Sequence, residues 1–464
     1  MPDTGDTAWM LTSAALVLLM TPGLAFFYGG MTRSKSVLNM MMMSMSALGL
    51  IGVLWVLYGY SMAFGDDVGL GLLGNPVQHL GLNGLFGGRY LAGDHGEAVA
   101  IPLVNTVPAT VFAAFQAMFA IVTVALISGA AADRLRFGPW LAFAGIWATV
   151  VYFPVAHWVF SFDGVTSEVG GWIANDLAAI DFAGGTAVHI NAGAAALALC
   201  IVLGKRRGWP REPMRPHNLT LVMLGSGLLW FGWFGFNAGS AVASDGVAGM
   251  TFVNTLVATS AGLLGWLLTE RIRDGKPTSL GAASGVVAGL VAITPSCSSV
   301  SPVGAIAVGS IAGVVCALAV GWKFRLGFDD SLDVIGVHLV GGLAGTLLVG
   351  LFATESAPAG VAGLFYGGGV DQLWRQAVGA VAVLAYSFVL SLVVAYVVKA
   401  VFGLRATDEN EVAGLDESEH AETAYDFSTL RVGGGLGAQR PLVPGAAARE
   451  PQVTATTTAS NREG

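Results

Sequence analysis

Two histidines, His189 and His338, lie in stretches of sequence that otherwise consist of apolar and small residues. An ionisable side chain at membrane depth costs roughly 3 kcal/mol on insertion scales, so it usually faces a cavity, a partner or a conduction path. An imidazole can also accept and release a proton near neutral pH. These residues in these surroundings indicate proton handling inside a membrane.

The sequences around the two histidines resemble each other. Segment 188–193 reads Val-His-Ile-Asn-Ala-Gly and segment 337–342 reads Val-His-Leu-Val-Gly-Gly. Each histidine follows an aspartate near the start of its apolar stretch, Asp181 in the first case and Asp333 in the second. One histidine in a glycine-rich helix fits a structural role equally well, whereas two at matched positions favour a shared pore.

The composition is that of a protein with many membrane spans. Of the 464 residues, 54% are hydrophobic and 11% are charged, while soluble domains carry roughly 25% charged residues. The 65 glycines allow membrane helices to approach closely. The net charge of -8 comes largely from the tail, because Asp408 to Asp426 contains eight acidic residues and no basic one. Nothing in the composition suggests a nucleic-acid partner.

Apolar stretches long enough to cross a bilayer, about 20 residues each, occur eleven times. The uncharged run from Thr278 to Gly321 is too long for one helix, and the turn from Pro295 to Pro302 divides it into two. The expected spans begin near Ala8, Val37, Ile101, Gly138, Phe182, Leu219, Val247, Thr278, Pro302, Val334 and Gln376.

Basic residues predict the sides of the membrane, because they are enriched in cytoplasmic loops. They fall in alternate loops, so we expect a multi-pass protein of the cell membrane with its N-terminus outside and its C-terminus in the cytoplasm. The loops concerned contain Arg33 and Lys35, Arg134 and Arg136, Lys205 to Arg207 with Arg211 and Arg215, Arg271 to Lys276, and Lys323 with Arg325.

Eleven spans with matched histidines in the fifth and tenth predict two repeats of five and a final helix. Because five is odd, the second repeat must enter the membrane with the opposite polarity, as in transporters that form their path between inverted repeats. The expected fold is therefore an all-α polytopic membrane protein with eleven transmembrane helices, built as an inverted 5+5 repeat plus a final helix.

The chain changes character after its last span. We expect a membrane domain over 1–402, a cytoplasmic tail over 403–430, and a disordered extension over 431–464, which is rich in Gly, Ala, Pro and Thr. Since anionic lipid repels an acidic segment, residues 405–425 should instead dock on basic cytoplasmic loops, above all on Lys205, Arg206 and Arg207 with Arg211 and Arg215.

Four motifs carry a resemblance to a known family. They are Thr-Pro-Gly-Leu-Ala-Phe-Phe-Tyr-Gly-Gly-Met at 21–31, Asp-Phe-Ala-Gly-Gly-Thr-Ala-Val-His at 181–189, Gly-Trp-Phe-Gly-Phe-Asn-Ala-Gly-Ser at 232–240, and Asp-Val-Ile-Gly-Val-His at 333–338. Through them the chain resembles the ammonium transporter family (Amt/Mep/Rh), of the bacterial Amt type, from about Trp9 to Leu430.

The resemblance implies a homotrimer in the lipid bilayer in which each subunit has its own pore. It implies that ammonium is recruited outside, loses a proton and crosses as ammonia, with no enzymatic reaction, cofactor or metal. It assigns the residues as follows: pore histidines His189 and His338; recruitment by Phe115, Phe160 and Ser240; a gate of Phe119 and Phe236; and Asp181 as a structural carboxylate of the vestibule.

At one position this chain departs from better-known bacterial members. They have a tryptophan in the outer site where this sequence has Phe160, and Trp158 stands two residues earlier. Tryptophan is the better cation-π partner. Either the site has a weaker aromatic wall, or Trp158 supplies part of it.

Other interpretations remain open at the level of sequence. The tail resembles the family's regulatory segment, which in many members responds to PII signalling proteins. An ammonium sensor, a Rh-like ammonia gas channel and a membrane-embedded enzyme are the alternatives. The enzyme is the least supported, because no carboxylate, serine or cysteine has a spacing typical of hydrolysis or metal binding.

Overall fold

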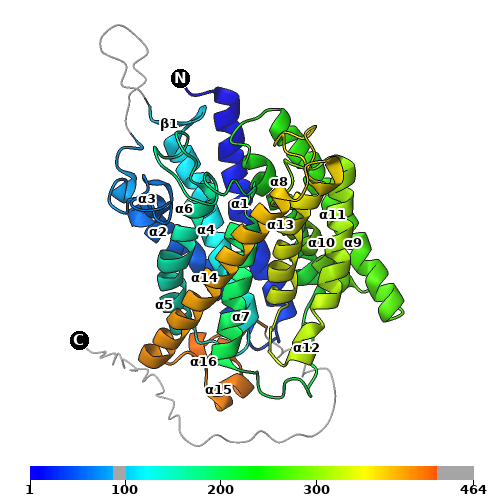
Figure 1. Ribbon diagram of the computed structural model, residues 1–464. Helices are drawn as coiled ribbons and strands as arrows, with labels where there is room; N and C mark the ends of the chain where they lie inside the picture. The colour runs from blue at the N-terminus through cyan, green and yellow to red at the C-terminus, as the bar shows by residue number, and fades with distance from the viewer. Residues whose placement is uncertain (87–100, 426–464) are drawn as a thin grey trace, which may run out of the picture. The chain divides into compact units, whose positions relative to one another are not determined.

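The computed structural model describes residues 1–86 and 101–425, and in this part of the chain ten helices are long and apolar enough to cross a membrane. The shorter apolar helix α10 completes the eleven expected spans (Figure 1). In chain order they are α1 (Thr4–Met31); α2 (Val37–Leu54) with η1 (Trp55–Gly59) and α3 (Tyr60–Phe64); α4 (Ala109–Ser128) with η3 (Gly129–Ala131); α5 (Phe137–Trp147) with η4 (Ala148–Tyr152) and α6 (Phe153–Phe160); η5 (Gly185–Ile190) with α7 (Asn191–Leu203); α8 (Leu219–Gly239); α9 (Gly246–Arg273); α10 (Ser279–Ile293); α11 (Pro302–Ala319) with α12 (Trp322–Leu326); η6 (Ile335–Leu339) with α13 (Val340–Phe352); and α14 (Asp371–Phe402).

The third span begins at Ala109, eight residues after the expected start at Ile101. The intervening residues form a short antiparallel hairpin of β1 (Leu103–Val104) and β2 (Val107–Pro108). The hairpin is held to the start of α1, since the Thr106 hydroxyl donates to Asp6 and the Asp3 N–H donates to the Thr106 carbonyl. Apolar side chains serve a strand or a helix equally, so hydropathy alone extends the span too far.

Close helix contacts explain part of the high glycine content. Helix α1 packs against α8 and α4. A Cβ at Gly225 of α8 would lie 2.4 Å from the backbone nitrogen of Phe27 in α1. Only glycine permits that approach, which brings the two helices together without a hydrophobic driving force in lipid.

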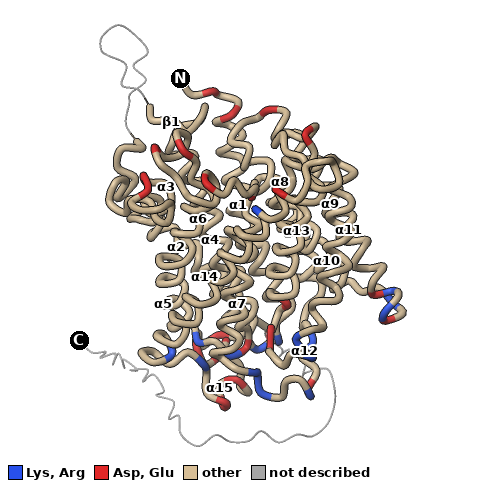
Figure 2. The backbone as a smooth tube through the Cα atoms, in the orientation of Figure 1, with Lys and Arg blue, Asp and Glu red and all other residues tan. Residues whose placement is uncertain are grey.

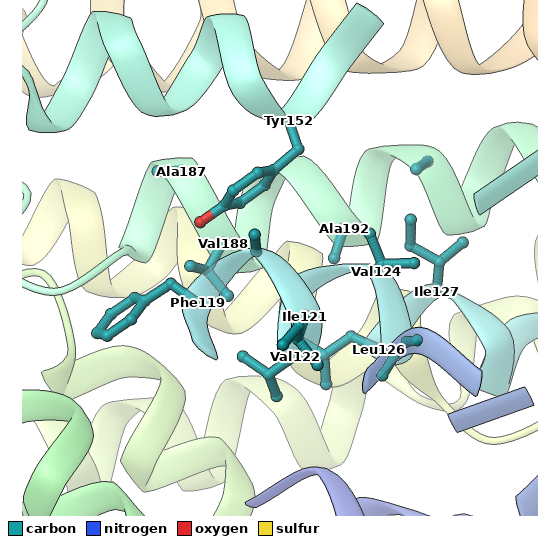
Figure 3. Packing of buried hydrophobic residues seen from close by; sticks show 14 of the residues in the cluster. Phe119, Ile121, Val122, Val124, Leu126, Ile127, Tyr152, Ala187, Val188 and Ala192 are labelled. Atoms are coloured by element: carbon teal, nitrogen blue, oxygen red, sulfur yellow. The ribbon is translucent and has the colours of Figure 1, made fainter. Parts of the chain in front are cut away.

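Helix α4 forms one wall of the core. Its apolar side chains lie beside Ala187 and Val188 of η5 and beside Ala192 of α7, with the ring of Tyr152 above them (Figure 3). Phe119 lies at one end of this row (Figure 3). The wall therefore joins α4 to the segment that carries His189.

Lys and Arg gather at one end of the bundle (Figure 2), and ion pairs with buried carboxylates tie the loops there together. The Arg206 guanidinium donates to both carboxylate oxygens of Asp329, at 2.9 Å each, and to Asp133 at 3.2 Å. Asp133 also accepts from Arg33 at 3.0 Å. Arg206 was expected to receive the tail, and this part of the prediction is wrong because its side chain is buried inside the loop cluster.

The described part of the tail docks on its own chain through α15 (Asp408–Ala413) and α16 (Leu415–His420). Glu411 accepts from the Arg207 backbone N–H at 2.6 Å, and Glu419 accepts from the backbone N–H of Phe137 at 3.0 Å. Met1–Ala424 form one compact unit. Residues 426–430 of the expected tail and the expected disordered extension over 431–464 lie outside the described residues.

Candidate functional site

The two histidines meet inside the bundle. Nδ1 of His338 lies 3.3 Å from Nδ1 of His189, and the ring centroids are 5.3 Å apart. Both side chains are buried, and each occupies a single π-helical turn, η5 or η6. Such turns occur frequently at functional sites. When both rings are neutral, one Nδ1 donates and the other accepts, so only one of the two Nε2 atoms carries a proton.

Each of these π-helical turns is capped by a carboxylate that stands eight residues before its histidine. Asp181 accepts from the backbone N–H groups of residues 184–187 at 2.5 to 3.1 Å, and the Thr186 hydroxyl also donates to it. Asp330 accepts from the N–H groups of Val334 and Ile335 at 3.1 and 2.7 Å. Asp333, the expected counterpart of Asp181, instead forms an ion pair with Lys323 at 2.5 Å.

Glycines four residues after each histidine let the two segments cross closely. A Cβ at Gly193 would lie 2.6 Å from the backbone nitrogen of Leu339, the residue that follows His338. A Cβ at Gly342 would lie 3.1 Å from Cβ of His189. The contact is reciprocal, as expected for two repeats, and it fixes the distance between the rings.

A narrow cavity of about 10 Å³ borders the histidine pair. That volume is about what one water-sized molecule needs. Within the described part of the chain, no Asp, Glu, Lys or Arg lines the cavity, which is bordered by Met20, Leu24, Phe27, Val122, Leu126, Val188, His189, Leu229, Trp233, Phe236, Val287 and His338.

Two stacked phenylalanines separate this cavity from a wider recess. The rings of Phe119 and Phe236 are 4.1 Å apart with an angle of 20° between their planes, and both are buried. Phe236 borders the narrow cavity and Phe119 borders the recess. The stacked pair therefore has one ring on the narrow cavity and the other on the recess.

The recess on the other side of this pair has a volume of about 140 Å³ and a polar and aromatic lining. Phe160 and Ser240, two of the three recruitment residues that the resemblance implies, line it. Phe115 is fully buried and does not line the recess; its ring packs against Phe119 with centroids 4.9 Å apart. The complete lining is Val104, Asn105, Phe112, Gln116, Phe119, Phe160, Phe162, Val165, Thr166, Phe182, Ser240, Ala241 and Val242.

Trp158 is not part of this recess. Its indole Nε1 donates to the Leu72 carbonyl at 2.7 Å, and its ring packs on Tyr386 and Trp172 at centroid distances of 4.6 and 5.9 Å. Trp158 therefore anchors the loop that contains Leu72, and of the two residues Phe160 is the one that lines the recess.

Comparison with known proteins identifies the family of this chain. The model of the Ammonium Transporter Family matches residues 8–425. The chain belongs to the ammonium transporter family. It is 70% identical over 436 residues to an ammonium transporter of Mycobacterium tuberculosis, covering 92% of this chain and 91% of the relative.

Solved structures of the ammonium transporter family share the fold. The crystal structure of Saccharomyces cerevisiae Mep2 is 33% identical, has a TM-score of 0.77, and the match covers 88% of each chain. A structure described as a sensor Amt protein is 30% identical, has a TM-score of 0.80, and the match covers 90% of this chain and 98% of that one. These likenesses confirm a multi-pass membrane fold of the Amt and Mep type. Because curated relatives are named as transporters, the family gives no support to an enzyme built on the histidine pair.

Three residues at the site of this ammonium transporter family member were not identified from sequence. Trp233 stacks on His189 with centroids 5.4 Å apart and donates from Nε1 to Thr294 at 2.9 Å. Gln116 lines the recess. Asp330 was overlooked in favour of Asp333, although it stands at the same distance from its histidine as Asp181. Trp233 lies in one of the four family motifs, and that was the available signal.

Proposed function

We propose that the recess recruits ammonium, that ammonium loses a proton at the phenylalanine pair, and that ammonia crosses the narrow cavity beside the two histidines. The observation that carries this proposal is the series of compartments. A recess with polar groups is followed by stacked rings, and then by a cavity whose lining is apolar except for the histidines and the Trp233 indole N–H, which donates to Thr294.

The narrow cavity suits a neutral molecule. An ion that must keep its charge loses several kcal/mol or more of hydration when it enters apolar surroundings. Potassium has no way to avoid that cost, whereas ammonium can leave its proton behind. Selectivity in this proposal therefore comes from the lining of the narrow cavity, since the mouth can attract either cation.

Recruitment rests on Phe160 and Ser240. The face of an aromatic ring attracts a cation by about 0.5 to 2 kcal/mol. The Ser240 hydroxyl donates to the Phe236 carbonyl at 2.9 Å, so its oxygen lone pairs are free to accept from ammonium. Phe115 takes part by supporting Phe119 from behind. Asp181 has a structural role, because backbone and hydroxyl groups already occupy its carboxylate.

The histidine pair offers a route for the proton that ammonium leaves behind. The hydrogen bond between the two Nδ1 atoms lets a proton arrive at one Nε2 while another leaves from the second Nε2. The Nε2 of His189 has no hydrogen-bond partner in the described structure. It is therefore available to exchange a proton with a molecule in the cavity.

The orientation and the assembly are also part of the proposal. Lys and Arg gather at the end of the bundle near α12 and α15 (Figure 2), which by the positive-inside rule is cytoplasmic and places the N-terminus outside. Large apolar side chains remain exposed on α8 and α9, including Phe231 and Leu264, and these faces suit contact between subunits of a homotrimer. A PII-type regulator would meet the cytoplasmic loops and the docked tail.

Reconstitution of the purified protein in vesicles tests the function. Ammonium should produce an inward current when proton and ammonia both cross, whereas equimolar potassium should produce none. Internal alkalinisation without current would instead indicate a neutral ammonia channel. The likeness to a structure described as a sensor Amt protein makes a sensor the second candidate, and ammonium binding with neither current nor alkalinisation would favour it.

A further inference from the structure

We propose that the recess beside α12, at the end of the bundle opposite the outer mouth, binds the headgroup of an anionic phospholipid. The inference rests on the proposed orientation of the chain and not on ammonium conduction. The recess measures about 730 Å³ and lies among the ends of α9, α11 and α12. It is separate from both cavities of the proposed pathway.

The charged lining of this recess is mainly basic. Arg273, Lys323 and Arg325 border it, together with the single carboxylate of Asp333. Lys323 is paired with Asp333, and Arg273 is paired with Asp274, which does not line the recess. Arg325 is exposed and forms no ion pair within the described residues. The excess of positive charge suits a phosphate group.

Helix α12 carries the two kinds of residue that gather at a membrane surface, aromatic and basic. Its sequence, Trp-Lys-Phe-Arg-Leu, places apolar and basic residues in turn. Trp322, Phe324 and Leu326 are 44%, 58% and 72% exposed. Aromatic rings at the end of a span sit at the level of lipid headgroups, and basic residues next to them favour anionic lipid.

Neighbouring residues brace this segment rather than cover it. The ring of Phe324 stacks on Trp209 with centroids 5.7 Å apart, and Nζ of Lys205 lies 5.2 Å from the centroid of the Trp209 ring. Nζ of Lys323 also donates to the Asp330 carbonyl at 3.0 Å. The segment is thus held against the bundle while Trp322, Phe324 and Leu326 stay exposed. A lipid headgroup bound there would contact the loop that leads to η6 and His338.

Native mass spectrometry of the full-length protein tests the proposal, with phosphatidylglycerol compared against phosphatidylcholine of the same acyl chains. The wild type should retain phosphatidylglycerol preferentially. The double variant Arg273→Gln/Arg325→Gln should bind it more weakly, by about fivefold for each basic group removed. The matched control Arg211→Gln/Arg215→Gln removes two exposed basic residues outside the recess and should retain wild-type binding.

Two results would overturn the lipid site: equal retention of the two lipids by the wild type, or the same loss in both double variants. Displacement of phosphatidylglycerol by millimolar inorganic phosphate would show a site for free phosphate instead. If the double variant does not fold, Arg325→Gln alone provides the test, because that side chain is exposed. Binding is measured without ammonium, so failure here leaves the transport proposal standing, and the reverse also holds.

Discussion

Nδ1 of His189 lies 3.3 Å from Nδ1 of His338, although 149 positions separate the two residues in the chain. The two helical segments that carry them cross where Gly193 of α7 meets Leu339 and Gly342 of α13 meets His189. Two histidines at matched positions of the sequence are thus in contact in the folded chain. The rings share one hydrogen bond, and the state of each imidazole depends on the other.

Removing either ring should disable the proposed proton route. In His189→Ala or His338→Ala, ammonium-dependent current in vesicles should fall at least tenfold, or potassium should begin to permeate through the enlarged cavity. The current ratio of ammonium to potassium is the measurement. His79→Ala removes a histidine that lines neither cavity and serves as the control. Wild-type rate and selectivity in both pore variants would contradict the assignment.

The glycine crossing predicts a graded effect on the histidine pair. Gly193→Ala forces a methyl group to 2.6 Å from Leu339, and overpacking of that kind costs roughly 1 to 3 kcal/mol. Gly342→Ala meets its neighbours at 3.1 Å and should be milder. Transport and melting temperature should both follow that order.

Controls for the glycine series come from helices of the same bundle. At Gly49 and Gly227 an added Cβ meets nothing within 4 Å. Alanine there should be neutral or slightly stabilising, since glycine weakens a helix by about 1 kcal/mol relative to alanine. If Gly193→Ala behaved like these controls, the crossing would not be fixing the distance between the rings.

The sequence was sufficient for the spans and for the histidines, because both depend on local composition and on repetition. It failed where position is decided by a contact distant in the chain. Pairing with Lys323 removes Asp333 from the capping role that Asp330 fills. The sequence predicts that Arg206 is an exposed loop cation, but its ion pair with Asp329 holds it in the interior. Such choices follow from three-dimensional partners that hydropathy does not record.

At the proposed outer site, too, contacts distant in the chain decide which residues line the recess. The family resemblance implied Phe115, Phe160 and Ser240 for this site; Phe160 and Ser240 line the recess, whereas Phe115 packs behind Phe119 and does not line it. The choice between Phe160 and Trp158 could not be made from sequence, because both lie on one short helix. The hydrogen bond from Trp158 to Leu72 decides it.

Phe160→Trp should strengthen recruitment, because tryptophan binds cations better than phenylalanine. The ammonium concentration that gives half-maximal current should fall by about two- to fivefold, with little change in the maximum. Trp158→Ala should instead lower stability by about 3 to 5 kcal/mol and leave the half-maximal concentration unchanged in the folded fraction. If the half-maximal concentration changed in Trp158→Ala and not in Phe160→Trp, Trp158 would form the aromatic wall.

The buried ion cluster predicts a pH-dependent stability. Burial alone would raise the pKa of Asp329, but hydrogen bonds and charge from Arg206 outweigh it and hold that pKa below the ordinary 3.8. The carboxylate therefore contributes stability above pH 3.8 that is lost as the pH falls through the lowered pKa. Arg206→Gln should lower the melting temperature at neutral pH, since breaking a buried pair costs about 3 to 5 kcal/mol.

The adjacent residue provides the control for that cluster. Arg207 is exposed and lies 3.5 Å from the exposed Asp408, and such pairs contribute about 1 kcal/mol or less. In melting curves recorded from pH 7 down to acid, Arg206→Gln should lower the melting temperature by a large amount, and Arg207→Gln should leave it almost unchanged. Equal losses would indicate that Asp329 does not depend on Arg206.

The docked tail predicts different results for two truncations. Ending the chain after Leu430 keeps every described tail contact and should leave transport and melting temperature unchanged. Ending it after Gly403 removes two hydrogen bonds. Asp416 accepts one, at 2.8 Å, from the backbone N–H of Asn39 at the start of α2, and Glu411 accepts the other from the backbone N–H of Arg207. Each lost hydrogen bond to a charged group is worth about 1.5 to 3 kcal/mol, so this truncation should melt earlier.

The tail can affect the pore only if its contacts differ between pore states. The contact of Asp416 with Asn39 is the place to look, because the second span begins there and burial raises the pKa of Asp416 above its ordinary value. Truncation after Gly403 should therefore lower vesicle current or remove its regulation, while limited proteolysis of the full chain should spare residues up to Tyr425. Uniform cleavage through α15 and α16, with unchanged current in the shorter chain, would rule out a docked regulatory tail.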